Sequence, residues 1–261
     1  MSSDSRTLEA QHLVKRFHGH AAVSDVSFVL RGGEILGYLG PNGSGKSLTL
    51  KMLTGLIEPS SGRVIYSGVD VTGGNVEFRR RFGYVPEEPH LYPFLSGREY
   101  LDLIAGLRDL PARDMRPKID ALLERFGLAE AAEQSISAYS KGMKQKTLLI
   151  AALLHNPELL ILDEPESGLD VGSILLLRHL VRVLAERGRA ILYSSHIVEN
   201  VERLCTRVIV LGAGRVIVDG NVDSIRTIAP SGSLEEAFAT LAAQRPDSLA
   251  SEIADIVTDH A

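Results

Sequence analysis

The stretch "GPNGSGKS", residues 40–47, decides the fold of this chain. It follows the short apolar run "ILGYL" and fits the phosphate-loop pattern GxxxxGK(S/T). Glycines let backbone N–H groups converge on phosphate oxygens, and the helix that follows presents its positive N-terminus to them. A glycine-rich turn without a ligand is the alternative. A strand before the loop and a helix after it favour a nucleotide phosphate site.

Two side chains of this loop have separate expected roles. Lys46 is expected to reach the outer phosphates, and the Ser47 hydroxyl is expected to bind Mg²⁺. The residues expected to contact the nucleotide are Gly40, Pro41, Asn42, Gly43, Ser44, Gly45, Lys46, Ser47 and Leu48.

The stretch "LLILDEP", residues 159–165, is the second strong signal. A continuous apolar run of strand length is typical of a parallel strand buried on both faces. Such a strand delivers the carboxylates that follow it to the edge of the sheet, beside the phosphate loop. Asp163 is expected to hold Mg²⁺, directly or through water, and Glu164 to orient or activate the attacking water. An isolated Asp-Glu pair is more often a solvated helix cap, but the phosphate loop reverses that weighting.

Composition sets the class of protein. The chain has 261 residues, 44% of them hydrophobic and 23% charged, as in ordinary soluble domains. This length suits one sizeable domain or one domain with a subdomain. The net charge of −5 argues against nucleic acid as the main partner, because no basic excess is present to bind phosphates.

Three features favour a cytoplasmic protein. Cys205 is the only cysteine, which excludes an internal disulfide and favours a reducing compartment. The start "MSSDSRTLEA" lacks the basic and apolar regions of a signal peptide. The longest apolar run, Leu148–Leu154, has seven residues, against the roughly 20 that a membrane helix needs.

Hydrophobic periodicity predicts strands near both ends of the chain and a helical middle. Strands are expected within residues 8–30 (two, antiparallel, broken near "HGH") and at 35–39, 63–68, 81–86, 158–165, 190–195, 207–214 and 215–220. Helices are expected from Lys46 to about Leu56, within 97–128, from Ser140 to about Leu154 and at 172–187, followed by short C-terminal helices and a loosely held tail from about Arg245.

Four further motifs follow the phosphate loop in a recognisable order. They are "YVPEEP" at 84–89, "YSKGM" at 139–143, "SGLD" at 167–170 and His196 in "SSH". With the phosphate loop and "LLILDEP", they make the chain resemble the nucleotide-binding subunit of an ATP-binding cassette (ABC) transporter from about residue 8 to 220. Six motifs in the correct order are far more specific than any one of them. The C-terminal "GSLEEAFATL" resembles the tail of cassettes in the drug- and ion-exporter branch.

The resemblance implies an α/β fold. Its parts would be a phosphate-loop NTPase core sheet, an N-terminal antiparallel β subdomain and an inserted α-helical (signature) subdomain. The ATPase domain is expected at residues 1–228, with the helical subdomain at about 88–156, and a short C-terminal helical extension and tail at 229–261.

The resemblance also implies ATP and Mg²⁺ as ligands and assigns residues to them. Glu87 would join Ser47 and Asp163 as a Mg²⁺ ligand. Phe17 would stack on adenine, although an aromatic side chain at this place could equally belong to a core. His196 would contact the γ-phosphate and act with Glu164 in catalysis. A single histidine after a strand is more often structural, but a strand end is where an α/β sheet places ligand groups.

The segment "YSKGM" has a role in a second copy of the chain if the resemblance holds. Ser140 begins a helix, whose first turn offers unpaired N–H groups and a positive dipole end, while a plain N-cap is the simpler interpretation. In the family two cassettes pack head to tail. Ser140 and Gly142 would therefore contact the ATP held by the partner, which is a second copy or a homologous cassette.

Several residues depart from the family pattern. Glu87 stands where glutamine is usual, so a neutral magnesium ligand becomes a charged one. Leu48 replaces the second hydroxyl of the usual GKST ending, and Lys141 and Met143 replace a glycine and a glutamine of the signature. These changes bear on affinity and rate, and they leave the residues needed for the reaction in place.

The motifs therefore predict an ATP-hydrolysing subunit that powers transport, with export favoured, through a membrane-spanning subunit on a separate chain. It would lie on the inner face of the cell membrane, with no nucleic acid partner. A soluble ABC-type ATPase that remodels a macromolecular complex is the alternative. One cassette and the lack of a heptad run favour transport. A nucleotide-binding regulator without catalysis would lack Glu164 or His196, and both are present.

The apolar cluster at residues 91–95, "LYPFL", is expected to be exposed next to the loop that carries Glu87. Such a cluster more often marks a contact than a solvated loop. The sequence predicts a groove here that receives a short cytoplasmic helix of the membrane partner.

Overall fold

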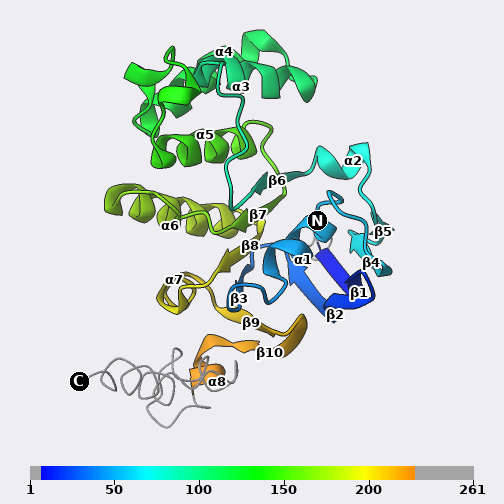
Figure 1. The fold of residues 1–261 in the computed structure, drawn as a ribbon. Coiled ribbons are helices and arrows are strands. Elements are labelled where there is room, and N and C mark those ends of the chain that lie inside the picture. The colour runs from blue at the N-terminus through cyan, green and yellow to red at the C-terminus, as the bar shows by residue number, and fades with distance from the viewer. Residues whose placement is uncertain (1–6, 227–261) are drawn as a thin grey trace, which may run out of the picture.

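The computed structural model describes residues 7–226 and contains two sheets, which Figure 1 shows side by side. The first sheet is antiparallel with the order β2-β1-β4-β5. Its strands are β1 (Thr7–Phe17), β2 (His20–Arg31), β4 (Ser61–Tyr66) and β5 (Val69–Asp70). The turn "HG" joins β1 to β2 with φ values of 47° at His18 and 82° at Gly19, as a two-residue hairpin of right-handed twist requires. The hairpin predicted within residues 8–30 is confirmed.

The second sheet carries the site and has the order β10-β9-β3-β8-β7-β6. Its strands are β3 (Ile35–Leu39), β6 (Phe82–Val85), β7 (Leu159–Asp163), β8 (Ala190–Ser195), β9 (Arg207–Gly212) and β10 (Arg215–Asn221). Strands β6, β7, β8, β3 and β9 are parallel, and β10 is antiparallel to β9. Every residue of β3, β7 and β8 is buried, which explains their continuous apolar sequences.

The helices divide into a group that flanks the sheets and a group inserted between β6 and β7. The first contains α1 (Lys46–Leu53), α2 (Val76–Arg79), α6 (Val171–Glu186), α7 (Val198–Leu204) and α8 (Val222–Arg226). The inserted group contains α3 (Gly97–Leu107), α4 (Ala112–Arg125), α5 (Lys141–Leu153) and two 3₁₀ turns at Ala129–Ala131 and Ile136–Ala138. Figure 1 shows the inserted helices together at the top of the view, above α6.

The structure corrects several predicted elements. The segment 97–128 is two helices, because Pro111 disfavours helical backbone at Leu110 and caps the start of α4. Helix α1 ends at Leu53 instead of Leu56, since Gly55 has a φ of 69°. Helices α2 and α7 and strand β5 were not expected. The expected extension at 229–261, the "GSLEEAFATL" resemblance and the tail from Arg245 lie outside the described residues.

Two apolar clusters hold the core sheet between its layers. Alternate residues of β7 point to opposite sides, so Leu160 and Leu162 pack with the inserted helices and α6, while Leu159 and Ile161 pack toward the first sheet. This sandwich fixes the carboxyl ends of β3, β7 and β8, where the motifs lie.

Candidate nucleotide-binding and catalytic site

The phosphate loop runs from the end of β3 to the start of α1, and two of its glycines are required by close contacts. A Cβ atom on Gly40 would lie 2.4 Å from Ser44 Oγ and 2.9 Å from the carbonyl oxygen of Leu211. Gly45 has a φ of 98°, and a Cβ atom there would lie 2.9 Å from the carbonyl oxygen of Ala22 on β2. The backbone of the first sheet therefore closes one side of the loop. A side chain at either glycine would push the loop away from the atoms that it contacts.

Lys46 lies inside this loop. Its Nζ atom donates to the carbonyl oxygens of Gly40 at 2.7 Å and Pro41 at 3.2 Å. Burial lowers the pKa of the Lys46 ammonium, and the negative charges of Glu164, Asp163 and Glu87 oppose that shift. A cation of this kind is stabilised further when phosphate oxygens approach it.

Asp163 ends β7 and is fully buried. Neither carboxylate oxygen has a hydrogen-bond partner among the described residues. Burial raises the pKa of Asp163, and the carboxylates of Glu87 and Glu164 raise it further. The hydroxyls of Ser47 and Ser194 lie close enough to favour its charged form, without reaching ordinary hydrogen-bond geometry. A buried carboxylate without donors is well suited to a cation.

Glu87, which follows β6, lies beside the phosphate loop. Ser47 Oγ donates to Glu87 Oε2 at 3.2 Å, so the two side chains meet beside Asp163. Carboxylate and hydroxyl oxygens are the ligands that Mg²⁺ prefers. The three residues predicted to bind the metal therefore lie together and fit it chemically.

Glu164 and His196 also meet at this edge of the sheet. Glu164 Oε1 lies 2.9 Å from Nδ1 of His196, which follows β8. The Glu164 side chain is 11% exposed and that of His196 is 53% exposed, so the pair joins the interior to the surface. Glu164 has a φ of 47°, and its N–H donates to the carbonyl oxygen of Ser194 at 3.2 Å. Left-handed backbone is costly for a residue other than glycine and is concentrated at functional sites.

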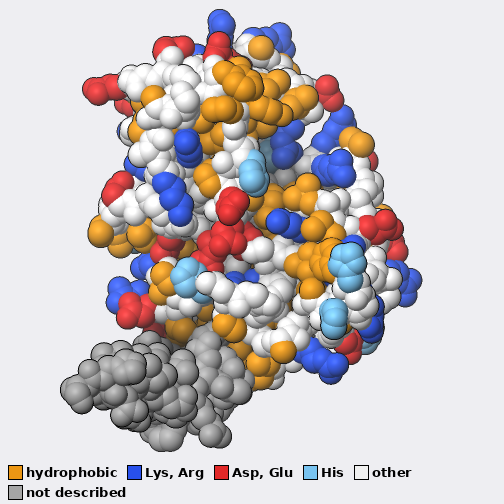
Figure 2. All heavy atoms as spheres, viewed as in Figure 1, with side chains coloured by type: hydrophobic (Ala, Val, Ile, Leu, Met, Phe, Trp, Pro, Cys, Tyr) orange, Lys and Arg blue, Asp and Glu red, His pale blue; other side chains and the backbone are white. Residues whose placement is uncertain are grey.

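Lys46, Ser47, Glu87, Asp163 and Glu164 line two adjoining pockets. The first, of about 370 Å³, is lined by Ala22, Asn42, Gly43, Gly45, Lys46, Ser47, Leu48, Glu87 and Glu164. The second, of about 480 Å³, shares Ser47 and Glu87 with it and adds Asp163. Volumes of this size are typical of small-molecule sites. Figure 2 shows acidic side chains gathered in the middle of the face below the helical part, with histidines beside them.

The structure does not bring every predicted site residue into these pockets. Phe17, at the end of β1, is 48% exposed and contacts Lys15, whose Nζ lies 5.4 Å from the ring centroid. Phe17, Ser140, Gly142 and His196 are absent from the lining of both pockets, and so are three residues of the loop: Gly40, Pro41 and Ser44. Ser140 caps α5 by accepting a hydrogen bond from the N–H of Met143 at 3.2 Å. The predicted helix start is therefore confirmed, while a contact to ATP stays a prediction.

Helix α5 is nevertheless in contact with the loop that follows β7. A Cβ atom on Gly142 would lie 2.5 Å from the carbonyl oxygen of Gly168. Gln145 is fully buried, and its Nε2 donates to the carbonyl oxygen of Pro165 at 3.2 Å. Gln145 was not predicted from the sequence, although a polar residue on an apolar helix face indicates a buried polar contact. Ser194, which pairs in register with Asp163 across β7 and β8, was not predicted either.

Comparison with known proteins decides the family. The sequence pattern of the family described as "ABC transporter" matches residues 23–167. The chain belongs to the ABC transporter family. The ABC transporter ATP-binding protein NatA of Bacillus subtilis is 35% identical over 83% of this chain and 89% of its own length. The Nod factor export ATP-binding protein I of Burkholderia thailandensis is 38% identical over 82% of this chain and 70% of its own length.

Solved structures agree with this assignment. The structure of an ATP-binding subunit of an ABC transporter, 36% identical, matches with a TM-score of 0.82 over 90% of this chain and 98% of that one. A dimeric bacterial ABC transporter cassette, 22% identical, shares the fold with a TM-score of 0.76 over 82% of this chain and 98% of that one. The predicted α/β fold, with its antiparallel subdomain, phosphate-loop core sheet and helical insertion, is confirmed.

The cassette is thus an ATP-binding subunit that hydrolyses ATP to drive transport by an ABC transporter. Within residues 7–226, no helix is both long enough and apolar enough to cross a membrane.

Proposed function

We propose that this subunit hydrolyses ATP at the carboxyl edge of its core sheet, with the residues that meet there in defined roles. The phosphate loop would hold the phosphates of the substrate with its N–H groups, and Lys46 would contact the outer phosphates. The constrained glycines support this, because they let the loop pack closely against Leu211 and Ala22 in a tightly curved shape. Phe17 would stack on adenine from the neighbouring hairpin.

Mg²⁺ would be held by Ser47, Asp163 and Glu87. The unpaired buried oxygens of Asp163 are the main support, together with the short separation of Ser47 and Glu87. Bound there, the ion would neutralise charge that develops on the phosphates. Because Glu87 is charged, we expect the affinity for the ion to differ from that of a site with glutamine.

Glu164 would accept a proton from the attacking water, and His196 would orient Glu164 and contact the terminal phosphate. The 2.9 Å contact between Glu164 Oε1 and His196 Nδ1 is the observation that carries this proposal. It places a half-exposed imidazole beside a nearly buried carboxylate that lines the phosphate pocket. A base needs such an orienting partner and such access to the substrate.

The variant Glu164→Gln tests this role. It keeps the size and hydrogen-bonding capacity of the side chain but removes the base. We expect ATP to bind with unchanged affinity and kcat to fall by about 10²–10⁴-fold, the usual contribution of general-base catalysis. Glu124→Gln is the control, because Glu124 is an exposed residue of α4 that lines neither pocket. Turnover within about twofold of wild type in Glu164→Gln would contradict the assignment.

The assembly would be a head-to-tail dimer, of two copies or with a homologous cassette, on the inner face of the cell membrane. Ser140 and Gly142 would close over the ATP held by the partner copy, which agrees with their absence from the pockets of their own chain. The cassette fold shared with a dimeric structure supports this arrangement. The membrane-spanning partner would be a separate chain, and similarity to an export protein favours export.

A further inference from the structure

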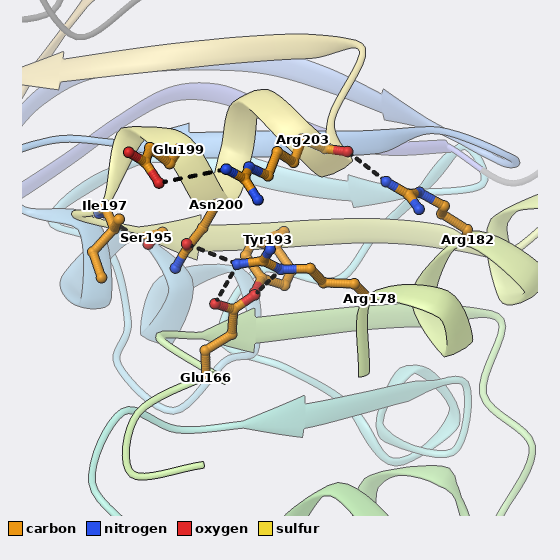
Figure 3. Close-up of polar contacts among 9 residues, drawn as sticks. All are labelled: Glu166, Arg178, Arg182, Tyr193, Ser195, Ile197, Glu199, Asn200 and Arg203. Carbon is orange, nitrogen blue, oxygen red and sulfur yellow. Dashed lines mark hydrogen bonds and ion pairs between the residues drawn. The ribbon is translucent and has the colours of Figure 1, made fainter. Parts of the chain in front are cut away.

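A buried polar cluster lies behind the catalytic edge and joins four elements (Figure 3). Arg178 on α6 donates from Nε to Glu166 Oε1 at 2.7 Å and from Nη2 to Glu166 Oε2 at 2.9 Å. The same Nη2 donates to Asn200 Oδ1 on α7 at 2.9 Å. Tyr193 on β8 donates its hydroxyl to Glu166 Oε1 at 2.6 Å. We call these four residues the Arg178 cluster.

The Arg178 cluster is shielded from water. The side chains of Arg178 and Glu166 are 14% and 10% exposed, Tyr193 is fully buried and Asn200 is 9% exposed. Hydrogen bonding to Glu166 raises the pKa of Arg178, and burial together with the Glu166 charge raises the pKa of Tyr193. A two-point guanidinium–carboxylate contact fixes both distance and orientation. Breaking it would leave a buried charge without a partner, so the geometry is strongly held.

The Arg178 cluster holds both loops of the catalytic edge. Glu166 comes two residues after Glu164, and Tyr193 comes three residues before His196. Asn200 comes four residues after His196, on the first turns of α7. The Arg178 guanidinium therefore ties the chain after Glu164 to the chain after His196. The Glu166 carboxylate ties it to the chain before His196 through Tyr193. A second link, from Arg182 Nη2 to the carbonyl oxygen of Arg203 at 2.6 Å, holds α6 to α7 (Figure 3).

We propose that Arg178 and Glu166 are positioning residues that set the contact between the Glu164 carboxylate and the His196 imidazole. This inference rests on the roles proposed above for Glu164 and His196. Neither Arg178 nor Glu166 lines the pockets at the phosphate loop, so they act through the two loops and not on the substrate. A shift of about 1 Å between the reacting groups is enough to cost up to 10²-fold in rate.

The test compares two arginine-to-lysine variants of the full chain. Arg178→Lys keeps the charge but loses the two-point contact. Arg207→Lys is the matched control, because Arg207 makes a similar contact with Asp219, at 2.6 Å from both Nε and Nη2, on β9 and β10. We expect Arg178→Lys to lower kcat by about 10-fold or more with KM for ATP within about twofold. Arg207→Lys is expected to lower the melting temperature comparably while kcat stays within about twofold.

A double variant shows whether Arg178 acts through the base. In the Glu164→Gln background, Arg178→Lys is expected to cause no further loss of single-turnover rate, because the group that it positions is absent. A full multiplicative loss in that background, or equal loss of kcat in both lysine variants, would overturn the inference. If Glu164→Gln alone retains its turnover, the proposed base is wrong, whatever Arg178→Lys does.

Should Arg178→Lys fail to fold, Tyr193→Phe removes only the hydroxyl donor and is expected to lower kcat with KM unchanged. Normal kcat in Tyr193→Phe would then overturn the inference.

Discussion

The protein alone does not stabilise the charged form of Asp163. The carboxylate is fully buried, its oxygens lack hydrogen bonds among the described residues, and burial raises its pKa. When the pKa of a carboxyl group is higher in the folded than in the unfolded chain, folding becomes less favourable as the pH rises from the unfolded-state pKa to the folded-state pKa. The charged form of Asp163 therefore lowers the free energy of unfolding, and a cation bound to it would remove this cost.

This leads to a prediction for Asp163→Asn. We expect the nucleotide-free variant to be more stable than wild type, because the amide removes the buried negative charge. We also expect it to lose the part of ATP-induced stabilisation that depends on Mg²⁺. Thermal unfolding with ATP plus EDTA and with ATP plus Mg²⁺ measures both effects. An unchanged magnesium-dependent increment would show that Asp163 does not hold the ion.

Single functional residues were predictable from the sequence where they lie together in one continuous motif. The phosphate loop and the pair Asp163 and Glu164 lie in continuous motifs, so spacing alone identified them. Ala22 was missed because its carbonyl oxygen meets Gly45 only when the first sheet folds over the loop. The Arg178 cluster was missed for the same reason. Its hydrogen-bonded pairs are 12 to 27 residues apart in sequence, and no periodicity pairs them.

His155 connects two elements, since it follows α5 and contacts β6. Its Nε2 lies 2.9 Å from the carbonyl oxygen of Phe82. Because a carbonyl oxygen only accepts, Nε2 carries the ring proton and the buried Nδ1 has no partner among the described residues. Burial lowers the pKa of His155 to about 4, and the charges of Arg108 and Lys118 add to this shift. Protonation of the His155 ring would therefore destabilise the packing of the end of α5 against β6.

The pKa of His155 predicts a pH dependence of stability. It lies below the ordinary value of 6.5, so stability is complete above about pH 6.5 and is lost as pH falls toward 4. We expect His155 to cost about 1 kcal/mol between pH 6.5 and pH 5, allowing for its partial exposure. His155→Gln retains a donor for Phe82 and should remove this loss, whereas His179→Gln, at an exposed position of α6, should not. Urea unfolding at several pH values measures it, and parallel curves for wild type and His155→Gln would contradict it.

Elements were predictable in proportion to their length and apolar content. Strands β3, β7 and β8 are buried on both faces and are therefore continuous apolar runs in the sequence. Helix α2 has four residues, too few for a helical period to emerge. Helix α7 carries Val198, Val201 and Leu204 at helical spacing, a signal that was present and overlooked.

On the scale of the whole molecule, an exposed aromatic patch stands out on the inserted helical part. Phe94 is 78% exposed and Tyr92 is 51% exposed, and their ring centroids are 6.4 Å apart. The segment is fixed from below, because the carbonyl oxygen of Pro93 accepts from the N–H of Ser137 at 2.9 Å. A rigid apolar patch of this kind suits a partner. The groove predicted there stays a prediction.

We expect Tyr92→Ser with Phe94→Ser to weaken binding to the membrane-spanning subunit by at least about 10-fold, as loss of two interface aromatics does. Intrinsic ATPase activity of the isolated subunit should stay within about twofold of wild type. Val69→Ser with Val76→Ser is the control, since both residues are exposed apolar positions on β5 and α2. Co-purification from membranes measures binding. Recovery of the membrane subunit at wild-type levels would count against this surface.

The last prediction concerns the dimer. Lys46 and Ser140 belong to different parts of the fold, the phosphate loop and the start of α5. If each closed site combines the loop of one copy with the signature of the other, Lys46→Ala and Ser140→Arg damage opposite halves of a site. A mixed dimer of the two variants then has one site with both lesions and one with neither. If the signature acts within its own chain, both sites of that mixed dimer are damaged.

The physical reason to expect the first result is charge, because ATP with its metal needs donors on both sides of the phosphates. The phosphate loop would supply one side, and the N-terminus of α5, capped by Ser140, would supply the other. Differently tagged variants are mixed, doubly tagged dimers are selected, and ATP retained per dimer is measured. We expect roughly one ATP in the mixed dimer and almost none in either parent. No retention in doubly tagged dimers would mean that Ser140 does not act on the partner's nucleotide.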